Sequence, residues 1–142
     1  MFPHWKKEPE AEPEWFQVLI DLARYLRTPE GCPWDREQSA LQFAKFAQEE
    51  AGELIESFEN NDNSHIEEEF GDVFFVLLAC AAAAEEEGRF SLKNALVRAH
   101  EKMIRRHDHV FGETKAKTPE DAIRMWNEMK AKEKAGKGDS AG

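Results

Sequence analysis

An uncharged apolar run over residues 73–84 constrains this chain more than any other feature of its sequence. The run is too short to cross a bilayer, because a spanning helix takes roughly 20 apolar residues. Strand signals are nearly absent along the chain, whereas helix start and stop signals recur on both sides of the run. A helix that is apolar on every side has to be covered by protein. The run therefore predicts a helix at the centre of a bundle or in a subunit interface.

Helix signals along the whole chain predict an all-α fold, a helical bundle of four to five helices. Asp35 with Gln38, and Ser64 with Glu67, have the spacing of a helix N-cap and its capping box. Gly88 suits a left-handed C-terminal cap. The expected helices cover residues 15–26, 35–58, 64–88 and 91–107, and a fifth begins near residue 118.

The length of 142 residues and the 41% hydrophobic content fit one domain. We expect a flexible N-terminal arm over residues 1–14, a folded domain over 15–135 and a disordered C-terminal tail over 136–142. Cys32 and Cys80 form neither a disulfide framework nor a CxxC metal site. No basic start precedes an apolar stretch, so a cytoplasmic location is expected.

The negative charge of the chain is concentrated in one window. Residues 49–72 contain ten carboxylates and no Lys or Arg, which accounts for the formal net charge of −10. The rest of the chain balances at 19 acids and 19 bases. No basic surface is left over to follow a phosphate backbone. We therefore expect no nucleic acid among the partners, and the short apolar run predicts no membrane.

Helical spacing places four of these acids toward the apolar faces. Glu50 falls inside the apolar arc of its helix and Glu53 lies at the edge of that arc. Glu69 and Asp72 align with apolar residues of the next helix. A buried, unpaired carboxylate costs several kcal/mol, so these acids need a cation or hydrogen-bond donors. If the two helices pair antiparallel, the four acids converge on a site for a hard dication such as magnesium, completed by substrate phosphates.

Two other interpretations of these acids compete with a magnesium site. A solvated acidic face explains most charged helices and suffices for Glu59, Glu67 and Glu68. A di-iron bundle needs a Glu followed three residues later by a His on each of two helices, and no His of this chain has that partner. The five histidines have no zinc spacing either.

The acidic segments EEAGE at residues 49–53 and EFGD at residues 69–72 resemble the EExxE and ExxD pair of MazG-type nucleoside triphosphate pyrophosphohydrolases, in the all-α NTP pyrophosphatase superfamily. The resemblance covers about residues 15–134, and the chain has one such domain where the best-known members have two. It therefore resembles their first domain. The flanking segments that follow the family's order are GCPWD at 31–35, EEEGRF at 85–90 and EKMIRRHDHVFG at 101–112.

The resemblance implies hydrolysis of nucleoside triphosphates to a monophosphate and pyrophosphate, as nucleotide-pool house-cleaning on normal or aberrant nucleotides. It implies Mg²⁺, or Mn²⁺ as the alternative, held by the four acids that helical spacing selects independently. Glu49 is the candidate general base. Lys102 and Arg106, one helical turn apart, are the implied phosphate ligands, with a merely solubilising surface pair as the alternative. The metal ligands are then Glu50, Glu53, Glu69 and Asp72.

The sequence supports two interpretations of Trp34 and Asp35 about equally. The indole could stack on a base while the carboxylate accepts a hydrogen bond from an amino group of that base. Alternatively, Asp35 is only a helix N-cap and Trp34 only a hydrophobic staple over the helix end.

The expected assembly is a homodimer, or a tetramer built as a dimer of dimers, because the family builds its core by pairing subunits and the apolar run agrees. The alternative function is a non-catalytic helical module that binds a metal or a partner protein through its acidic face. That module tolerates replacement of Glu50 and Asp72, whereas hydrolysis requires both.

Overall fold

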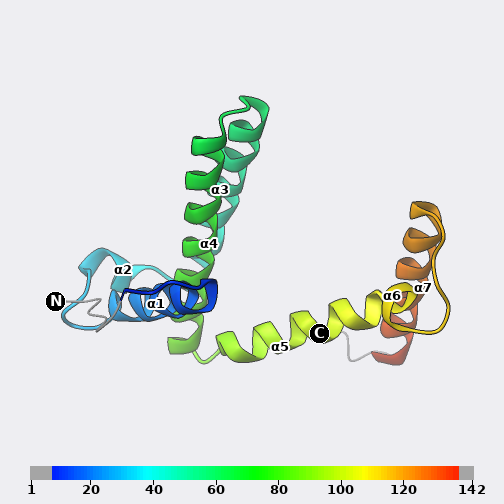
Figure 1. Cartoon of the computed structure of the whole chain (residues 1–142). Coiled ribbons are helices and arrows are strands. Elements are labelled where there is room, and N and C mark those ends of the chain that lie inside the picture. The colour runs from blue at the N-terminus through cyan, green and yellow to red at the C-terminus, as the bar shows by residue number, and fades with distance from the viewer. Residues whose placement is uncertain (1–7, 138–142) are drawn as a thin grey trace. The chain divides into compact units, whose positions relative to one another are not determined.

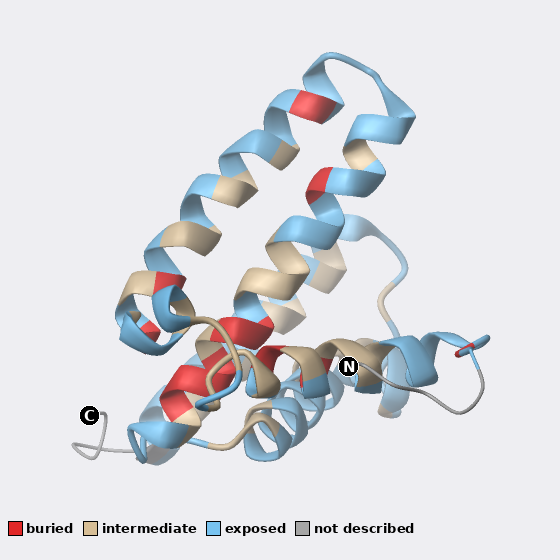
Figure 2. Ribbon diagram, turned by 90° about the vertical axis from the view of Figure 1, so that its left-hand side faces the viewer, coloured by how far each residue is buried: buried red, intermediate tan, exposed pale blue. Residues whose placement is uncertain are grey.

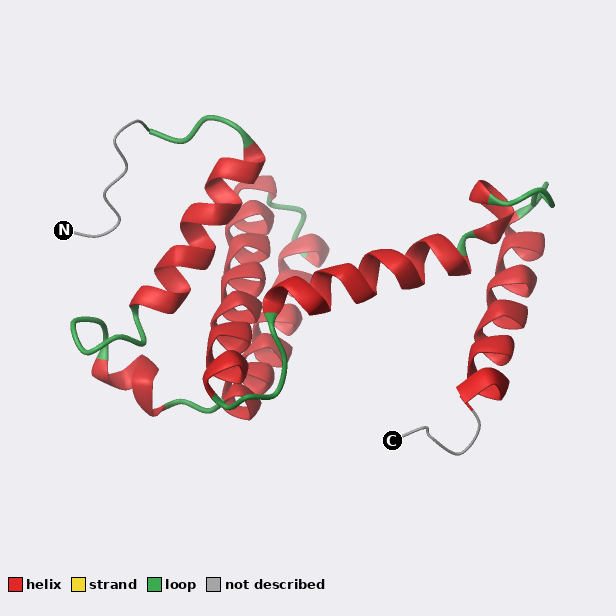
Figure 3. Ribbon diagram, turned by 90° about the horizontal axis from the view of Figure 1, so that it is seen from below, coloured by secondary structure: helices red, strands yellow, loops and turns green. Residues whose placement is uncertain are grey.

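The computed structural model describes residues 8–137, and the chain forms two compact units. The first unit runs up to Leu92 and the second begins at Lys93. Every regular element within the described range is a helix (Figure 3), which confirms the all-α fold. Among these helices, none has the length and apolar character needed to span a membrane. Residues 1–7 of the expected arm and 138–142 of the expected tail lie outside the described residues.

A helical hairpin dominates the first unit. It consists of α3 (Ala40–Glu59) and α4 (Asn63–Glu86), which run side by side and are joined by a tight turn (Figure 1). Asn61 in this turn has φ 55°, a left-handed conformation that asparagine tolerates better than most residues. α1 (Glu12–Tyr25) packs against α4, and the short α2 (Pro33–Glu37) precedes the hairpin.

Two predicted helix starts in this unit are wrong. The expected helix over residues 35–58 is interrupted, because Gln38 and Ser39 are extended and Ser39 caps α3 by accepting a hydrogen bond from the N–H of Gln42 at 3.1 Å. The cap of α4 is Asp62 rather than Ser64, since the Asp62 carboxylate accepts from the Ser64 N–H at 3.1 Å. Ser and Asp are both strong N-caps, so neighbouring candidates compete.

The buried core of the first unit is built mainly from alanine, and it lies where α1 and the start of α3 meet the second half of α4 (Figure 2). Because alanine projects little from a helix, the backbones approach closely there. Large apolar side chains remain outside this core, exposed on α3 and α4. The buried cluster members are Ile20, Ala23, Ala40, Phe43, Leu78, Ala79, Ala82, Ala83 and Ala84, and the exposed side chains include Ile55, Phe58, Phe70 and Leu77.

Acids at the end of α4 hold separate helices together. Glu85 accepts hydrogen bonds from the guanidinium of Arg24 at 3.2 Å and from the backbone N–H of Leu92 at 2.9 Å. Glu87 accepts from the backbone N–H of Ala40 at 2.8 Å, which satisfies a free donor at the start of α3. These bonds give the acidic run before Gly88 a structural role. Gly88 itself has φ 72°, which confirms the predicted left-handed cap.

The second unit contains α5 (Leu92–Arg106) from Lys93 onward, α6 (Asp108–Phe111) and α7 (Pro119–Lys137). Glu133 of α7 joins the two long helices by accepting from Arg105 at 2.5 Å and from Arg106 at 2.9 Å. The guanidinium of Arg106 also lies 5.3 Å from the ring centre of Trp126, a cation–π distance. In the second unit, charged and aromatic side-chain contacts therefore link α5 to α7, and α6 packs against α7.

We expect the second unit to lose stability in acid because of Glu133. Hydrogen bonds from Arg105 and then Arg106 lower the pKa of this carboxyl from 4.5 to about 2. A lowered folded-state pKa stabilises the fold above the unfolded value, and this stabilisation is lost as the pH falls from 4.5 toward 2. Far-ultraviolet circular dichroism during thermal unfolding at stepped pH measures the effect.

In Glu133→Gln, the fall of the thermal midpoint between pH 4.5 and 2 should be smaller than in the unmodified chain. Glu128→Gln, at an exposed position of the same helix, should show the same fall as the unmodified chain. An identical pH dependence in Glu133→Gln and the unmodified chain would contradict the assignment.

Candidate metal centre

Three carboxylates converge between the two helices of the hairpin. Glu50 comes from α3, and Glu69 and Asp72 come from α4, one turn apart. One carboxylate oxygen of each lies within 4.8 Å of the others. Glu69 is only 8% exposed, Glu50 is half-buried and Asp72 is exposed, so the cluster opens to solvent on one side.

The buried oxygens of this cluster lack donors. Oε2 of Glu50 and Oε2 of Glu69 are both buried and accept no hydrogen bond within the part of the chain that the structure describes. Burial raises the pKa of Glu50, and the hydrogen bond and charge of the neighbouring Glu53 raise it further. Burial also raises the pKa of Glu69, and the charges of Glu53 and Asp72 raise it further. Placing these ionised carboxylates side by side is therefore unfavourable in free energy, as expected of a site that binds a cation.

Glu53 lies beside the cluster rather than within it. Its side chain is exposed, and it contributes through its hydrogen bond and charge to Glu50. Of the four acids selected from the sequence, the structure therefore brings three together and places the fourth next to them.

His65 is a neighbour of the cluster that was not predicted from the sequence. Its Nε2 lies 3.1 Å from Oε1 of Glu69, one helical turn further along α4. The imidazole satisfies one oxygen of Glu69, which leaves Oε2 as the acceptor without a donor in the described part of the chain. The i,i+4 spacing of the two residues was the signal that could have found this pair.

A pocket of about 370 Å³ adjoins the cluster and shares Glu50 with it. Aromatic rings form much of its wall. Trp34 stacks on Phe46 with ring centres 5.7 Å apart and meets Phe43 edge-on at 6.1 Å, yet it remains 51% exposed. The pocket is lined by Leu26, Trp34, Asp35, Phe43, Phe46, Glu49, Glu50, Phe75, Val76 and Ala79.

Asp35 does not have the role of a helix cap that the sequence allowed. It lies within α2, and Ser39 caps α3 instead. Its backbone carbonyl accepts from Arg27, but its carboxylate makes no hydrogen bond or ion pair with any of residues 8–137. The carboxylate of Asp35 is therefore an available acceptor at the edge of the pocket.

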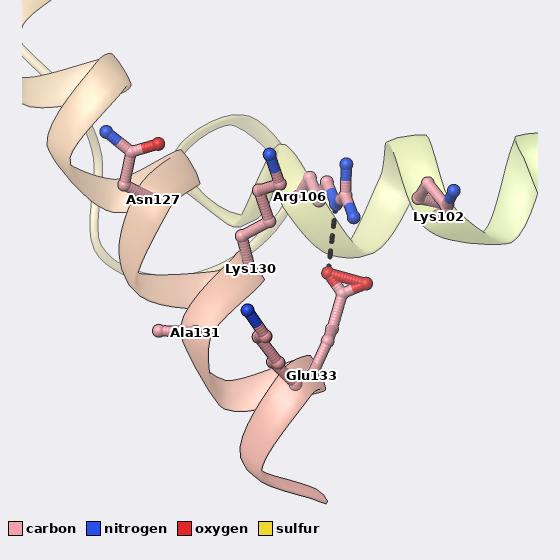
Figure 4. Close-up of a pocket in the computed structure, with 7 residues that line it drawn as sticks. Lys102, Arg106, Asn127, Lys130, Ala131 and Glu133 are labelled. Carbon is pink, nitrogen blue, oxygen red and sulfur yellow. Dashed lines mark hydrogen bonds and ion pairs between the residues drawn. The ribbon is translucent and has the colours of Figure 1, made fainter. Parts of the chain in front are cut away.

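Lys102 and Arg106 lie in a different pocket, of about 450 Å³, within the second unit (Figure 4). α7 adds two more cations to this pocket, Lys130 and Lys134, which were not predicted from the sequence. Their i,i+4 spacing was visible in the sequence, but no local signal indicated that they would face α5. The acid of this pocket is Glu133, whose carboxylate is already bonded to Arg106 at 2.9 Å. The pocket therefore has an excess of positive charge that suits a polyanion.

Residues 38–111 match the MazG nucleotide pyrophosphohydrolase domain. The chain is 37% identical to the nucleoside triphosphate pyrophosphohydrolase/pyrophosphatase MazG of Thermotoga maritima over 122 residues, covering 86% of this chain and 46% of that protein. It is 34% identical to the nucleoside triphosphate pyrophosphohydrolase of Escherichia coli (strain K12) over 120 residues, covering 84% and 46%. It is also 37% identical to the uncharacterized protein YabN of Bacillus subtilis over 119 residues, covering 84% and 24%.

A solved structure supports the same relationship. The crystal structure of a mazG-related protein from Thermotoga maritima matches with a TM-score of 0.69 and 31% identity, covering 81% of this chain and 98% of that one. The chain spans about half the length, or less, of the curated relatives named above.

Proposed function

This chain belongs to the MazG nucleotide pyrophosphohydrolase family, and from that premise we propose that it hydrolyses nucleoside triphosphates to a nucleoside monophosphate and pyrophosphate. The observation that carries the proposal is the convergence of Glu50, Glu69 and Asp72, with two buried oxygens that have no donor among residues 8–137. We assign the activity to residues 15–135.

The residues of the cluster fit a hard dication, because carboxylate oxygens are the ligands that magnesium prefers. Glu50, Glu69 and Asp72 would hold it, with Glu53 completing the acidic side and Mn²⁺ as the alternative ion. When bound, the ion supplies positive charge to phosphate oxygens and lowers the pKa of water. His65 orients Glu69 by occupying its Oε1.

Glu49 is the proposed general base. It adjoins Glu50 in α3, is exposed and lines the aromatic pocket, so a water molecule can approach it. In the reaction the oxygen of water forms a bond to phosphorus while one P–O bond of the α–β bridge breaks. Glu49 accepts the proton that the water loses, and pyrophosphate and monophosphate separate.

Lys102 and Arg106 are the proposed phosphate ligands. Together with Lys130 and Lys134 they surround a pocket in which Glu133 already neutralises part of the charge of Arg106. A guanidinium and several ammonium groups bind phosphate oxygens through charge-assisted hydrogen bonds. Trp34 and Asp35 are the proposed contacts of the base.

We propose that the working unit is a homodimer, or a tetramer built from two such dimers. The buried core is mostly alanine, whereas Ile55, Phe58, Phe70 and Leu77 are each at least half exposed on the hairpin. Exposed apolar side chains of this size on a small helical unit mark a protein interface. A second copy of the chain is the occupant that its family context favours.

The test is pyrophosphate release from a panel of normal and aberrant nucleoside triphosphates, with Mg²⁺, with Mn²⁺ and with a chelator. Metal-dependent release of pyrophosphate and monophosphate in equal amounts is expected. If the folded, metal-loaded protein turns over no member of the panel, the activity is refuted and a non-catalytic binding module becomes the better interpretation.

A further inference from the structure

The polar side chains of the aromatic pocket beside the acid cluster are mostly hydrogen-bond acceptors. The polar side chains of its lining are the carboxylates Asp35, Glu49 and Glu50, apart from the indole N–H of Trp34. Ionised carboxylates are acceptors only. The pocket therefore offers a ligand many acceptors and a single side-chain donor.

The shape and position of this pocket suit a nucleobase. Trp34, Phe43 and Phe46 form a wall of mutually packed rings, and a volume of about 370 Å³ leaves room for a planar ring. Aromatic side chains bind bases by stacking on their π-faces, whatever the base. Glu50 belongs both to the pocket and to the acid cluster, so one nucleotide could place its base in the first and its phosphates at the second.

The three carboxylates are not equally available to a base. Glu50 belongs to the acid cluster, and Glu49 is the proposed general base. The carboxylate that remains available to a base is that of Asp35, because it caps no helix and has no hydrogen-bond or ion-pair partner among residues 8–137. Asp35 is therefore the group best placed to distinguish one base from another.

Base edges differ in the donors that they present to such an acceptor. Adenine offers its N6 amino group and cytosine its N4 amino group, whereas thymine, and likewise uracil, presents an O4 acceptor at the corresponding edge. Hypoxanthine has a carbonyl where adenine has its amino group. A carboxylate that faces a carbonyl loses its hydrogen bonds with water and gains none in return.

We propose that Asp35 makes this chain prefer nucleotides whose base carries an exocyclic amino group. The inference rests on the proposed function and adds a substrate class to it. CTP is favoured over UTP, and ATP is favoured over ITP. Nucleotides whose bases have been deaminated are consequently poor substrates rather than the main target.

The experiment compares kcat/KM for the matched pairs CTP and UTP, and ATP and ITP, in the unmodified chain and in Asp35→Asn. The unmodified chain should favour the amino-bearing member of each pair by about tenfold or more, the effect of one hydrogen bond to a charged group. Asparagine can turn its NH₂ group toward O4 of uracil, so the CTP to UTP ratio should fall by about tenfold or more in the variant.

Glu37→Gln is the matched control, because Glu37 is an exposed acid of the same short helix and does not line the pocket. It should leave both ratios unchanged. Equal turnover within each pair by the unmodified chain, or ratios unaltered by Asp35→Asn in a variant with unchanged circular dichroism, would overturn the inference and leave the pyrophosphohydrolase activity intact. Absence of turnover with every nucleotide would overturn both.

Discussion

Replacement of Glu69 by glutamine should reduce metal-dependent pyrophosphate release by about two to three orders of magnitude. Charge stabilisation by a bound metal ion is worth several kcal/mol in a transition state, and each 1.36 kcal/mol is a factor of ten. Glu69 is the most buried acid of the cluster, at 8% exposure, and its Oε2 has no donor among the described residues. Glutamine keeps the shape of the side chain but removes the negative charge that attracts the ion.

The same substitution should not destabilise the metal-free protein. Burial and the charges of Glu53 and Asp72 raise the pKa of Glu69, so folding disfavours its ionised form relative to the unfolded chain. Glu69→Gln removes that unfavourable charge, and the thermal midpoint without metal should stay the same or rise. Loss of activity together with retained stability separates a ligand from a residue that merely supports the fold.

The measurements are initial rates of pyrophosphate release, Mn²⁺ binding by electron paramagnetic resonance, and the thermal midpoint with chelator. Glu67→Gln is the control, since Glu67 is an exposed acid of the same helix and lies outside the cluster. Wild-type rates and Mn²⁺ affinity in Glu69→Gln would remove Glu69 from the metal site.

Substitution of Ala83 by leucine should have the largest effect on stability. Ala83 is fully buried at 0% exposure and belongs to the cluster in which Ala79 and Ala84 of α4 meet Ala40 and Phe43 of α3. Added methylene and methyl groups in a filled core typically cost about 1–3 kcal/mol, because neighbouring side chains and backbone have to move. We expect a loss in the free energy of unfolding within this range.

Urea unfolding followed by circular dichroism measures this loss. Ala44→Leu makes the same chemical change at an exposed position of α3 and should leave the free energy of unfolding nearly unchanged. Equal stability of Ala83→Leu and the unmodified chain would show that α3 and α4 can separate without cost, contrary to the alanine packing described above.

The acid cluster was the part of the site that the sequence predicted best. Residues three or four apart share a helix face, so the positions of Glu50, Glu69 and Asp72 relative to their apolar neighbours follow from counting alone. The break between α2 and α3 was not predicted, because Asp35 and Ser39 are both good caps and nothing local chooses between them. The same error assigned Asp35 a capping role and left its function undecided.

By itself, the sequence determined the helical class, the positions of most helices and the faces on which the acids lie, because these depend on residues within a turn or two of one another. The tertiary structure alone decided which faces meet. Ala40 and Phe43 of α3 pack against alanines of α4. Carboxylate oxygens from the two helices lie within 4.8 Å of one another, and Glu87 reaches the start of α3 from 47 residues away. Such contacts depend on the shape of whole surfaces that fit together, and no short stretch of sequence encodes them.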